Sequence, residues 1–366
     1  MENVLFLQSD VKDPFSFYAR MRQKHPVYYD ESNKIWAVYT YKYSKEILTT
    51  SYSQIPVLQS MAYQSDALSG IVKWLARLTN GVEHEGARSA AMHLMTRWKE
   101  CDVPSLVHSL MGEPRLPATV EWVGSIAKRL PAFALIKGFG FSISDALQVL
   151  PEIENLVKLM IPVKSEEEIA TIAGSVKRVK EKFDQYFSTD LPTNHEREVY
   201  FTNFIGLLIQ SYDATSGLLS NALLQYVKRP DFRPTTLQGY INFVIESARL
   251  DPAVHNTRRT MVGNLHIGKH MIKSGDQVLI VLASANRDDD VLEQADEFVT
   301  DRKIANLSFG TGIHQCIAQH FSTQLAASLL HYLNMKYSRL EIQENEIQYE
   351  ARINVRLPKK ITLLVN

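Results

Sequence analysis

Hydrophobic positions near the N-terminus switch from helical to strand-like spacing. Between Asp13 and His25 apolar residues recur at helical spacing, which predicts a helix. The next segment, Pro26 to Tyr41, has two short apolar arms around the polar residues 31–34, the pattern of a β-hairpin. From about 42 to 250 helical patterns dominate, interrupted by clusters of Pro, Gly and Asn.

Strand-like patterns return in the last third of the chain. They cover residues 261–282 and, at the C-terminal end, residues 353–365, where β-branched residues alternate with polar ones. Between them, residues 317–335 read as a long apolar helix. We therefore predict a mainly α protein with small β-sheets, forming a single compact domain over residues 1–366. Its β-rich parts are 26–41 and 261–282, and its mainly helical parts are 42–250 and 317–335.

Composition narrows the class of protein. The chain has 366 residues, of which 45% are hydrophobic and 22% charged, so it is globular rather than disordered or collagen-like. Lys plus Arg equals Asp plus Glu at 40 each, which argues against a nucleic-acid partner. Two cysteines cannot form a disulfide framework and favour a reducing compartment. The N-terminus lacks a signal-peptide pattern and no apolar run approaches about 20 residues, so we expect a cytoplasmic protein without a membrane partner.

The most informative segment surrounds Cys316. Residues 306–319 read NLSFGTGIHQCIAQ and lead into the apolar helix, where the helix N-terminus would favour a thiolate. A lone cysteine is more often a buried apolar residue, and His314, Cys316 and His320 could instead belong to a zinc site, although no fourth ligand is evident. Neither alternative explains why Phe309, Gly310, Gly312, His314 and Cys316 occur together. At ordinary residue frequencies this combination would arise by chance at less than about one starting position in a million.

This segment resembles the haem-ligand loop of the cytochrome P450 family, F-G-x-G-x-H-x-C-x-G. Ala318 replaces the last glycine of that pattern. The resemblance implies the P450 fold of the soluble bacterial type. It also implies haem b (iron protoporphyrin IX) as the cofactor, with the Cys316 thiolate as the metal ligand and Phe309 beside the haem.

Other motifs of the family follow in the expected order. Glu246-Ser247-Ala248-Arg249 matches its E-x-x-R pair, Ala285-Asn286-Arg287-Asp288 matches its A-N-R-D segment, and Phe298 and Arg302 lie where its aromatic–Arg segment lies. Alone, an E-x-x-R would be an i,i+3 ion pair on a solvated helix face. The resemblance further implies that the haem propionates are bound by His84, Arg88, Arg259 and His314. Arg258 is the alternative to Arg259, because successive residues of a strand face opposite sides.

One departure concerns the family's oxygen-activation helix, normally A/G-G-x-D/E-T-T. The matching stretch is Gln210-Ser211-Tyr212-Asp213-Ala214-Thr215, so Ala214 stands beside the cofactor where the family has a threonine that orders the proton-delivering water. Thr215 lies one residue later, about 100° round a helix. We therefore expect proton delivery to involve Asp213, Gln210, Thr215 or the substrate's own polar groups; otherwise the reaction is not an ordinary monooxygenation.

The resemblance implies a monooxygenase (EC 1.14 type) acting on a small natural-product-like molecule. Alternatives are a peroxygenase, an oxidative coupling, dehydration or isomerisation enzyme, or a catalytically silent haem or ligand-binding protein. By order, the regions covering the substrate are 51–78, 150–173, 253–257 and 351–354, and the first carries Gln54, Val57, Leu58, Met61 and Tyr63. A ferredoxin or flavodoxin would dock near Arg97, Lys99 and Cys316, and the protein is expected to be a monomer.

Overall fold

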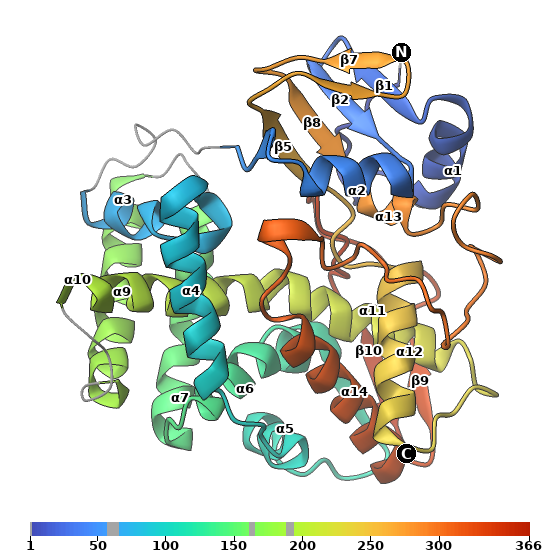
Figure 1. The fold of residues 1–366 in the computed structure, drawn as a ribbon. Helices are drawn as coiled ribbons and strands as arrows, with labels where there is room; N and C mark the ends of the chain where they lie inside the picture. The colour runs from blue at the N-terminus through green and yellow to red at the C-terminus, as the bar shows by residue number, and fades with distance from the viewer. Residues whose placement is uncertain (1, 57–65, 161–164, 188–193) are drawn as a thin grey trace. The chain divides into compact units, whose positions relative to one another are not determined.

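The computed structural model describes residues 2–56, 66–160, 165–187 and 194–366. The chain (Figure 1) divides into two compact units. Unit 1 is built from three pieces of the chain: Met1–Gln54, Glu113–Ala127 and Ala214–Asn366. Unit 2 is built from the two intervening pieces, Ile55–Gly112 and Lys128–Asp213.

Unit 1 contains all the described β-strands together with six α-helices. Its helices are α1 (Pro14–Lys24), α2 (Tyr41–Thr49), α11 (Ser216–Val227), α12 (Leu237–Leu250), α13 (Leu282–Ala285) and α14 (Gln319–Lys336), with the short turns η3 (Val123–Ala127) and η7 (Gly312–His314). Its strands are β1 (Val27–Asp30), β2 (Ile35–Val38), β3 (Ser53–Gln54), β4 (Ala118–Glu121), β5 (Thr257–Met261), β6 (Leu265–Ile267), β7 (His270–Ile272), β8 (Gln277–Ile280), β9 (Leu340–Ile342) and β10 (Thr362–Val365).

The larger sheet of unit 1 has the strand order β1-β2-β8-β5-β3, and within it β2 and β8 run parallel. Val278 and Ile280 pack with Ile47 of α2 on one face, whereas Leu279 packs with Met21 of α1 on the other. Figure 1 shows α1 and α2 beside these strands. A strand covered on both faces needs a continuous apolar run, which explains why the sequence here does not alternate.

A second sheet joins β4 to the C-terminal strands in the order β4-β10-β9. The sequence prediction was wrong in treating residues 118–121 as part of a helical region, because their partner β10 lies at the far end of the chain. Strand β5 begins at Thr257, before the predicted start at 261. In the predicted strand 353–365 only Thr362–Val365 forms a strand, preceded by isolated bridges such as Val254–Val355.

All the described regular elements of unit 2 are helical. Its elements are α3 (Asp66–Lys73), η2 (Ala76–Leu78), α4 (Gly81–Arg97), α5 (Val103–Met111), α6 (Leu130–Gly138), α7 (Ile143–Val149), η4 (Leu150–Glu152), α8 (Ile153–Val157), η5 (Lys158–Met160), α9 (Glu166–Tyr186) and α10 (Asn194–Gln210). Helix α9 starts with a capping box, in which the Ser165 side chain and Glu168 satisfy each other's backbone N–H groups. A π turn, η6 (Ser211–Thr215), follows α10 and precedes α11 along the chain.

The prediction of a mainly α protein with small β-sheets is confirmed, as is the N-terminal helix followed by a hairpin. The single domain spanning 1–366 stays a prediction. No helix among the described residues is both long and apolar enough to cross a membrane.

Candidate functional site

The Cys316 loop is hydrogen-bonded to α12 and to the residue that follows α13, both in unit 1. Asn286, which follows α13, accepts from the Leu307 N–H through its side-chain oxygen (2.6 Å) and donates to Ser308 Oγ (2.8 Å). Ser308 in turn donates to the carbonyl of Ala248 in α12 (2.6 Å). Inside the loop the Cys316 N–H donates to the carbonyl of Phe309 (2.9 Å). The loop is therefore closed on itself and fixed to α12 and α13.

Two glycines let this loop take its shape. Gly310 and Gly312 both have positive φ, +68° and +75°, a conformation that L side chains rarely adopt. At Gly312 a Cβ atom would also lie 2.6 Å from the carbonyl oxygen of Leu48 in α2, so the backbones touch there. The loop ends in η7, and Cys316 is exposed just before α14, with Ala318 as the N-cap. The predicted position of Cys316 before a helix N-terminus is confirmed.

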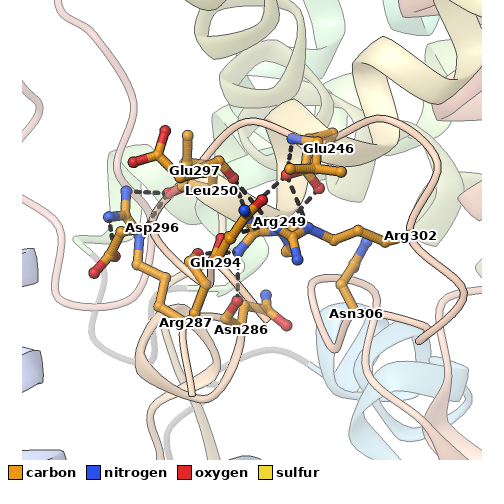
Figure 2. A network of polar contacts seen from close by, with 12 residues as sticks. Glu246, Arg249, Leu250, Asn286, Arg287, Gln294, Asp296, Glu297, Arg302 and Asn306 are labelled. Atoms are coloured by element: carbon orange, nitrogen blue, oxygen red, sulfur yellow. Dashed lines mark hydrogen bonds and ion pairs between the residues drawn. The ribbon is translucent and has the colours of Figure 1, made fainter. Parts of the chain in front are cut away.

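A buried ion-pair network supports the Cys316 loop. Glu246 and Arg249 are 3% and 1% exposed and form a bidentate pair, with Nε to Oε2 at 2.8 Å and Nη2 to Oε1 at 2.7 Å. Arg302 donates to the same carboxylate from Nε (3.1 Å), as does the backbone N–H of Val299 (2.8 Å). The predicted joining of Glu246, Arg249 and Arg302 is confirmed (Figure 2).

The remaining donors of the two guanidinium groups bind backbone carbonyls. Arg249 Nη1 donates to the carbonyls of Asn286 (2.8 Å) and Ala295 (2.6 Å), and its Nη2 donates to that of Glu297 (2.7 Å). Asn286 therefore contacts the ion-pair network through its backbone carbonyl and the Cys316 loop through its side chain. Figure 2 shows Asn286 beside Arg249 in the network. Sequence reasoning recognised Asn286 only as part of a motif and missed this linking role.

Arg259 on β5 is a buried cation. It is 4% exposed, whereas Arg258 is exposed, which confirms that only one of the two arginines points inward. Arg259 Nη1 donates to Thr257 Oγ1 (3.1 Å) and to the Arg258 carbonyl (2.8 Å). Among the described residues no carboxylate forms an ion pair with it, and burial lowers the pKa of its guanidinium to about 10. His314 is half-buried at the end of η7 in the same unit.

The other predicted propionate ligands lie on α4 of unit 2. His84 and Arg88 are one helical turn apart, His84 buried and Arg88 half-buried. The His84 ring nitrogen Nδ1 lies 2.8 Å from the carbonyl oxygen of Ala76 in η2. This contact fixes the ring orientation.

The proton-delivery candidates lie in and around the π turn η6. In unit 2, Gln210 is exposed and its side-chain N–H donates to the Gly206 carbonyl (3.0 Å), while Asp213 is half-buried. In unit 1, Ala214 is half-buried and Thr215 is buried, with its Oγ1 3.3 Å from Ser322 Oγ of α14. A π turn contains more residues than an α-helical turn, so successive side chains rotate by less than the 100° used for Thr215.

Several expectations concern other parts of the chain. Val57, Leu58, Met61 and Tyr63 lie outside the described residues. Cys101 packs in unit 2, with Sγ 3.6 Å from the carbonyls of Lys99 and Ala134. Within the described residues, which include His314, Cys316 and His320, no group of three or more His, Cys, Asp or Glu side chains could hold a metal ion.

Comparisons with known proteins agree on one family. A family model described as "Cytochrome P450" matches residues 238–364, the part that carries the ion-pair network and the cysteine loop. Cytochrome P450 119 of Sulfolobus acidocaldarius is 25% identical over 360 residues, covering 91% of this chain and 94% of that protein. Biotin biosynthesis cytochrome P450 of Bacillus subtilis is 23% identical, covering 94% of each chain.

A solved structure matches over almost the whole length. P450BioI, in complex with a hexadec-9Z-enoic acid ligated acyl carrier protein, superposes with a TM-score of 0.79 at 20% identity. The match covers 98% of this chain and 100% of that one, so the likeness extends well beyond the segment that the family model matches.

Proposed function

The chain belongs to the cytochrome P450 family, and we propose that it is a haem-thiolate monooxygenase that oxidises a small natural-product-type molecule. Members of this family bind haem b through a cysteine thiolate. The observation that carries the proposal is the exposed Cys316, held in a loop that two positive-φ glycines shape and a buried ion-pair network supports. A cysteine that served only to pack would be buried.

The residues around Cys316 fit a haem group. Arg259 is buried, and none of the described carboxylates forms an ion pair with it. Because burying an uncompensated charge is costly, a haem propionate would be a suitable partner for it. His314 stands two residues before the proposed ligand. The family resemblance further implies that His84 and Arg88, on α4 of unit 2, bind propionates. Bound haem b would supply the activation of dioxygen. Cys316 would ligate its iron, and Arg259 would hold a propionate in place.

Replacing Arg259 by glutamine should weaken haem binding without destabilising the apoprotein. A hydrogen bond to a charged group contributes about 1.5–3 kcal/mol, so the haem dissociation constant should rise by about tenfold to a hundredfold. Removing an uncompensated buried cation should leave the urea midpoint of the apoprotein unchanged or higher. Haem affinity is measured by transfer to an excess of a haem-scavenging apoprotein.

Arg258→Gln is the matched control, because this neighbour is exposed on the same strand. It should leave haem affinity at the wild-type value. Equal effects of the two substitutions would show that Arg259 has no special relation to the cofactor.

The π turn bears on the type of reaction. Ala214 has no hydroxyl group to order a water, whereas a positioned proton donor typically accelerates a reaction by about 10²–10⁴-fold. The proposed monooxygenase therefore needs another group to position the water. Asp213 and Thr215 are the nearest candidates along the chain, and Gln210 lies four residues before Ala214. Electrons would come from a ferredoxin or flavodoxin, and Arg97 and Lys99 are candidates for its docking site. We further propose that the protein acts as a monomer.

Restoring the hydroxyl tests this interpretation. The haem-loaded protein, a surrogate ferredoxin with its reductase and NADPH are combined, and the peroxide released per oxygen consumed is measured. Ala214→Thr should lower this peroxide fraction by severalfold, because protons then reach the oxygen faster than peroxide leaves. Ala214→Val, which adds the same bulk without a hydroxyl, is the matched control and should not lower it. An unchanged peroxide fraction in the threonine variant would remove the reason for seeking a substitute donor.

The same alanine favours a second candidate function, a P450-fold enzyme with different chemistry such as peroxide-driven oxidation. The two candidates differ in their co-substrate. The monooxygenase forms product with NADPH, oxygen and the surrogate reductase, whereas the second candidate forms product with hydrogen peroxide alone. Product formed only with peroxide would replace the first proposal by the second.

A further inference from the structure

Two buried hydroxyl groups of unit 1 face each other where the start of α11 meets α14. Thr215 Oγ1 lies 3.3 Å from Ser322 Oγ, and the two residues are 6% and 4% exposed. Among the described residues, each hydroxyl group has the other as its hydrogen-bond partner. Because buried polar groups are almost always paired, this contact satisfies two hydroxyl groups that would otherwise be left without a partner.

Neighbouring hydroxyl groups on the same two helices do not make such a contact. On α11, Ser216 and Ser220 are fully buried, and their hydroxyl groups have no partner within the described part of the chain. On α14, the hydroxyl group of Thr323 donates back to carbonyls of its own helix (2.8 and 3.1 Å). The contact between Thr215 and Ser322 is therefore a specific feature of the helix pair, which burial alone does not produce.

The hydroxyl pair joins the two elements that carry the proposed cofactor contacts. Thr215 follows directly on Ala214, the residue expected beside the haem. Ser322 lies near the start of α14, six residues after Cys316, and its N–H donates to the carbonyl of the N-cap residue Ala318 (2.8 Å). One hydroxyl contact thus connects the turn that carries Ala214 with the helix that follows the proposed iron ligand.

A second contact ties the other ends of the same helices. The Tyr226 hydroxyl group at the end of α11 donates to the side-chain oxygen of Asn334 near the end of α14 (2.5 Å). Tyr226 lies 11 residues after Thr215, which is three helical turns to within about 20°, so both point from the same face of α11. With contacts at both ends, the start of α11 cannot shift along α14 without breaking the contact between Thr215 and Ser322.

The threonine suits a fixed contact of this kind. A threonine hydroxyl in a helix commonly bonds to a carbonyl three or four residues earlier, as Thr323 does. Thr215 ends the π turn η6, whose backbone hydrogen bonds span five residues instead of four, so the earlier carbonyls are displaced from their α-helical positions. Its hydroxyl group reaches across to α14 instead, and a hydroxyl group can both donate and accept in such a contact.

We propose that Thr215 and Ser322 are positioning residues, which together fix the turn that carries Ala214 relative to the helix that follows Cys316. The proposal rests on the haem-thiolate function proposed above. It removes Thr215 from the candidates for proton delivery, because the Thr215 hydroxyl group is buried and is directed at Ser322. Sequence reasoning missed Ser322, although a serine within the predicted apolar helix 317–335 was an available signal.

The test measures the infrared C–O stretching band of the reduced, haem-loaded protein with bound carbon monoxide. This band responds to the surroundings of the bound ligand, so a displaced turn shifts or splits it. Thr215→Val keeps the shape of the side chain and removes the hydroxyl group, and Ser322→Ala removes its partner. Each should change the band, and the two combined should change it no further, because both remove the same contact. Thr215→Ser, which keeps the hydroxyl group, should retain the wild-type band.

Thr323→Val and Ser220→Ala are the matched controls. Each removes a buried hydroxyl group from one of the two helices without touching the contact between Thr215 and Ser322. Both should keep the wild-type band. A control that changes the band as much as Thr215→Val does would overturn the proposal.

The peroxide assay separates positioning from proton donation. A positioning role predicts that Thr215→Val and Ser322→Ala raise the released peroxide fraction to the same extent, whereas a proton-donating Thr215 would leave Ser322→Ala without effect. The proposal is overturned by that second result, by an unchanged band in either variant, or by changes that add when the two are combined. The visible spectrum of the same samples tests the proposed function separately. A histidine-type spectrum contradicts that function, whereas a thiolate-type spectrum with an unchanged C–O band contradicts only the positioning role.

Discussion

Replacing Cys316 by serine should abolish the thiolate-type absorption spectrum and NADPH-dependent oxygen consumption. A serine hydroxyl is not deprotonated as readily as a thiol and does not supply the electron density that a thiolate gives to haem iron. The fold should survive the change, because Cys316 is exposed and the loop is held by its own backbone and by Asn286. Exposed substitutions usually alter the free energy of unfolding by less than about 0.5 kcal/mol.

The second cysteine provides the control for this substitution. Cys101 packs in unit 2 against the carbonyls of Lys99 and Ala134, and burial is the main influence raising the pKa of its thiol. Cys101→Ser should keep the wild-type spectrum. If Cys316→Ser retained the thiolate-type spectrum, or if Cys101→Ser lost it, the assignment of the ligand would be wrong.

Breaking the Glu246 network has the largest expected effect on stability. Glu246→Gln leaves the buried Arg249 and the half-buried Arg302 without this countercharge and weakens the acceptor of the Val299 N–H. Removing one partner of a buried ion pair typically costs about 3–5 kcal/mol. Because Asn286 joins this network to the Cys316 loop, the fraction of purified protein that carries haem should fall together with the urea midpoint.

Glu297→Gln is the matched control. Its side chain is exposed, and only its backbone carbonyl takes part in the network, as acceptor from Arg249 and Arg302. It should leave both haem content and the urea midpoint unchanged. Should Glu246→Gln be too unstable to purify, Arg302→Lys weakens the same network more gently and should give an intermediate loss. Full stability of both variants would contradict the role assigned to the network.

Sequence reasoning predicted best where residue identity and spacing are fixed by chemistry. Cys316 and its glycines could be found because positive φ and close backbone contact leave few alternatives at Gly312. Strand alternation predicted that only one of Arg258 and Arg259 points inward, and the family resemblance selected Arg259. Helical spacing predicted the Glu246–Arg249 pair, and the resemblance identified it as structural. These signals are local, so the sequence carries them without knowledge of the fold.

Features that depend on distant partners could not be predicted. Strand β4 is four residues long and exists through pairing with β10 at the other end of the chain. The π turn at Ser211–Thr215 likewise altered the helical geometry from which the direction of Thr215 was predicted.

The most direct measurement of the central claim is the carbon monoxide difference spectrum of the purified, dithionite-reduced protein. Thiolate ligation by Cys316 predicts the strongly red-shifted band that distinguishes haem-thiolate proteins from histidine-ligated ones. A spectrum of the histidine-ligated type in freshly prepared protein, or the absence of bound haem after reconstitution, would contradict the account.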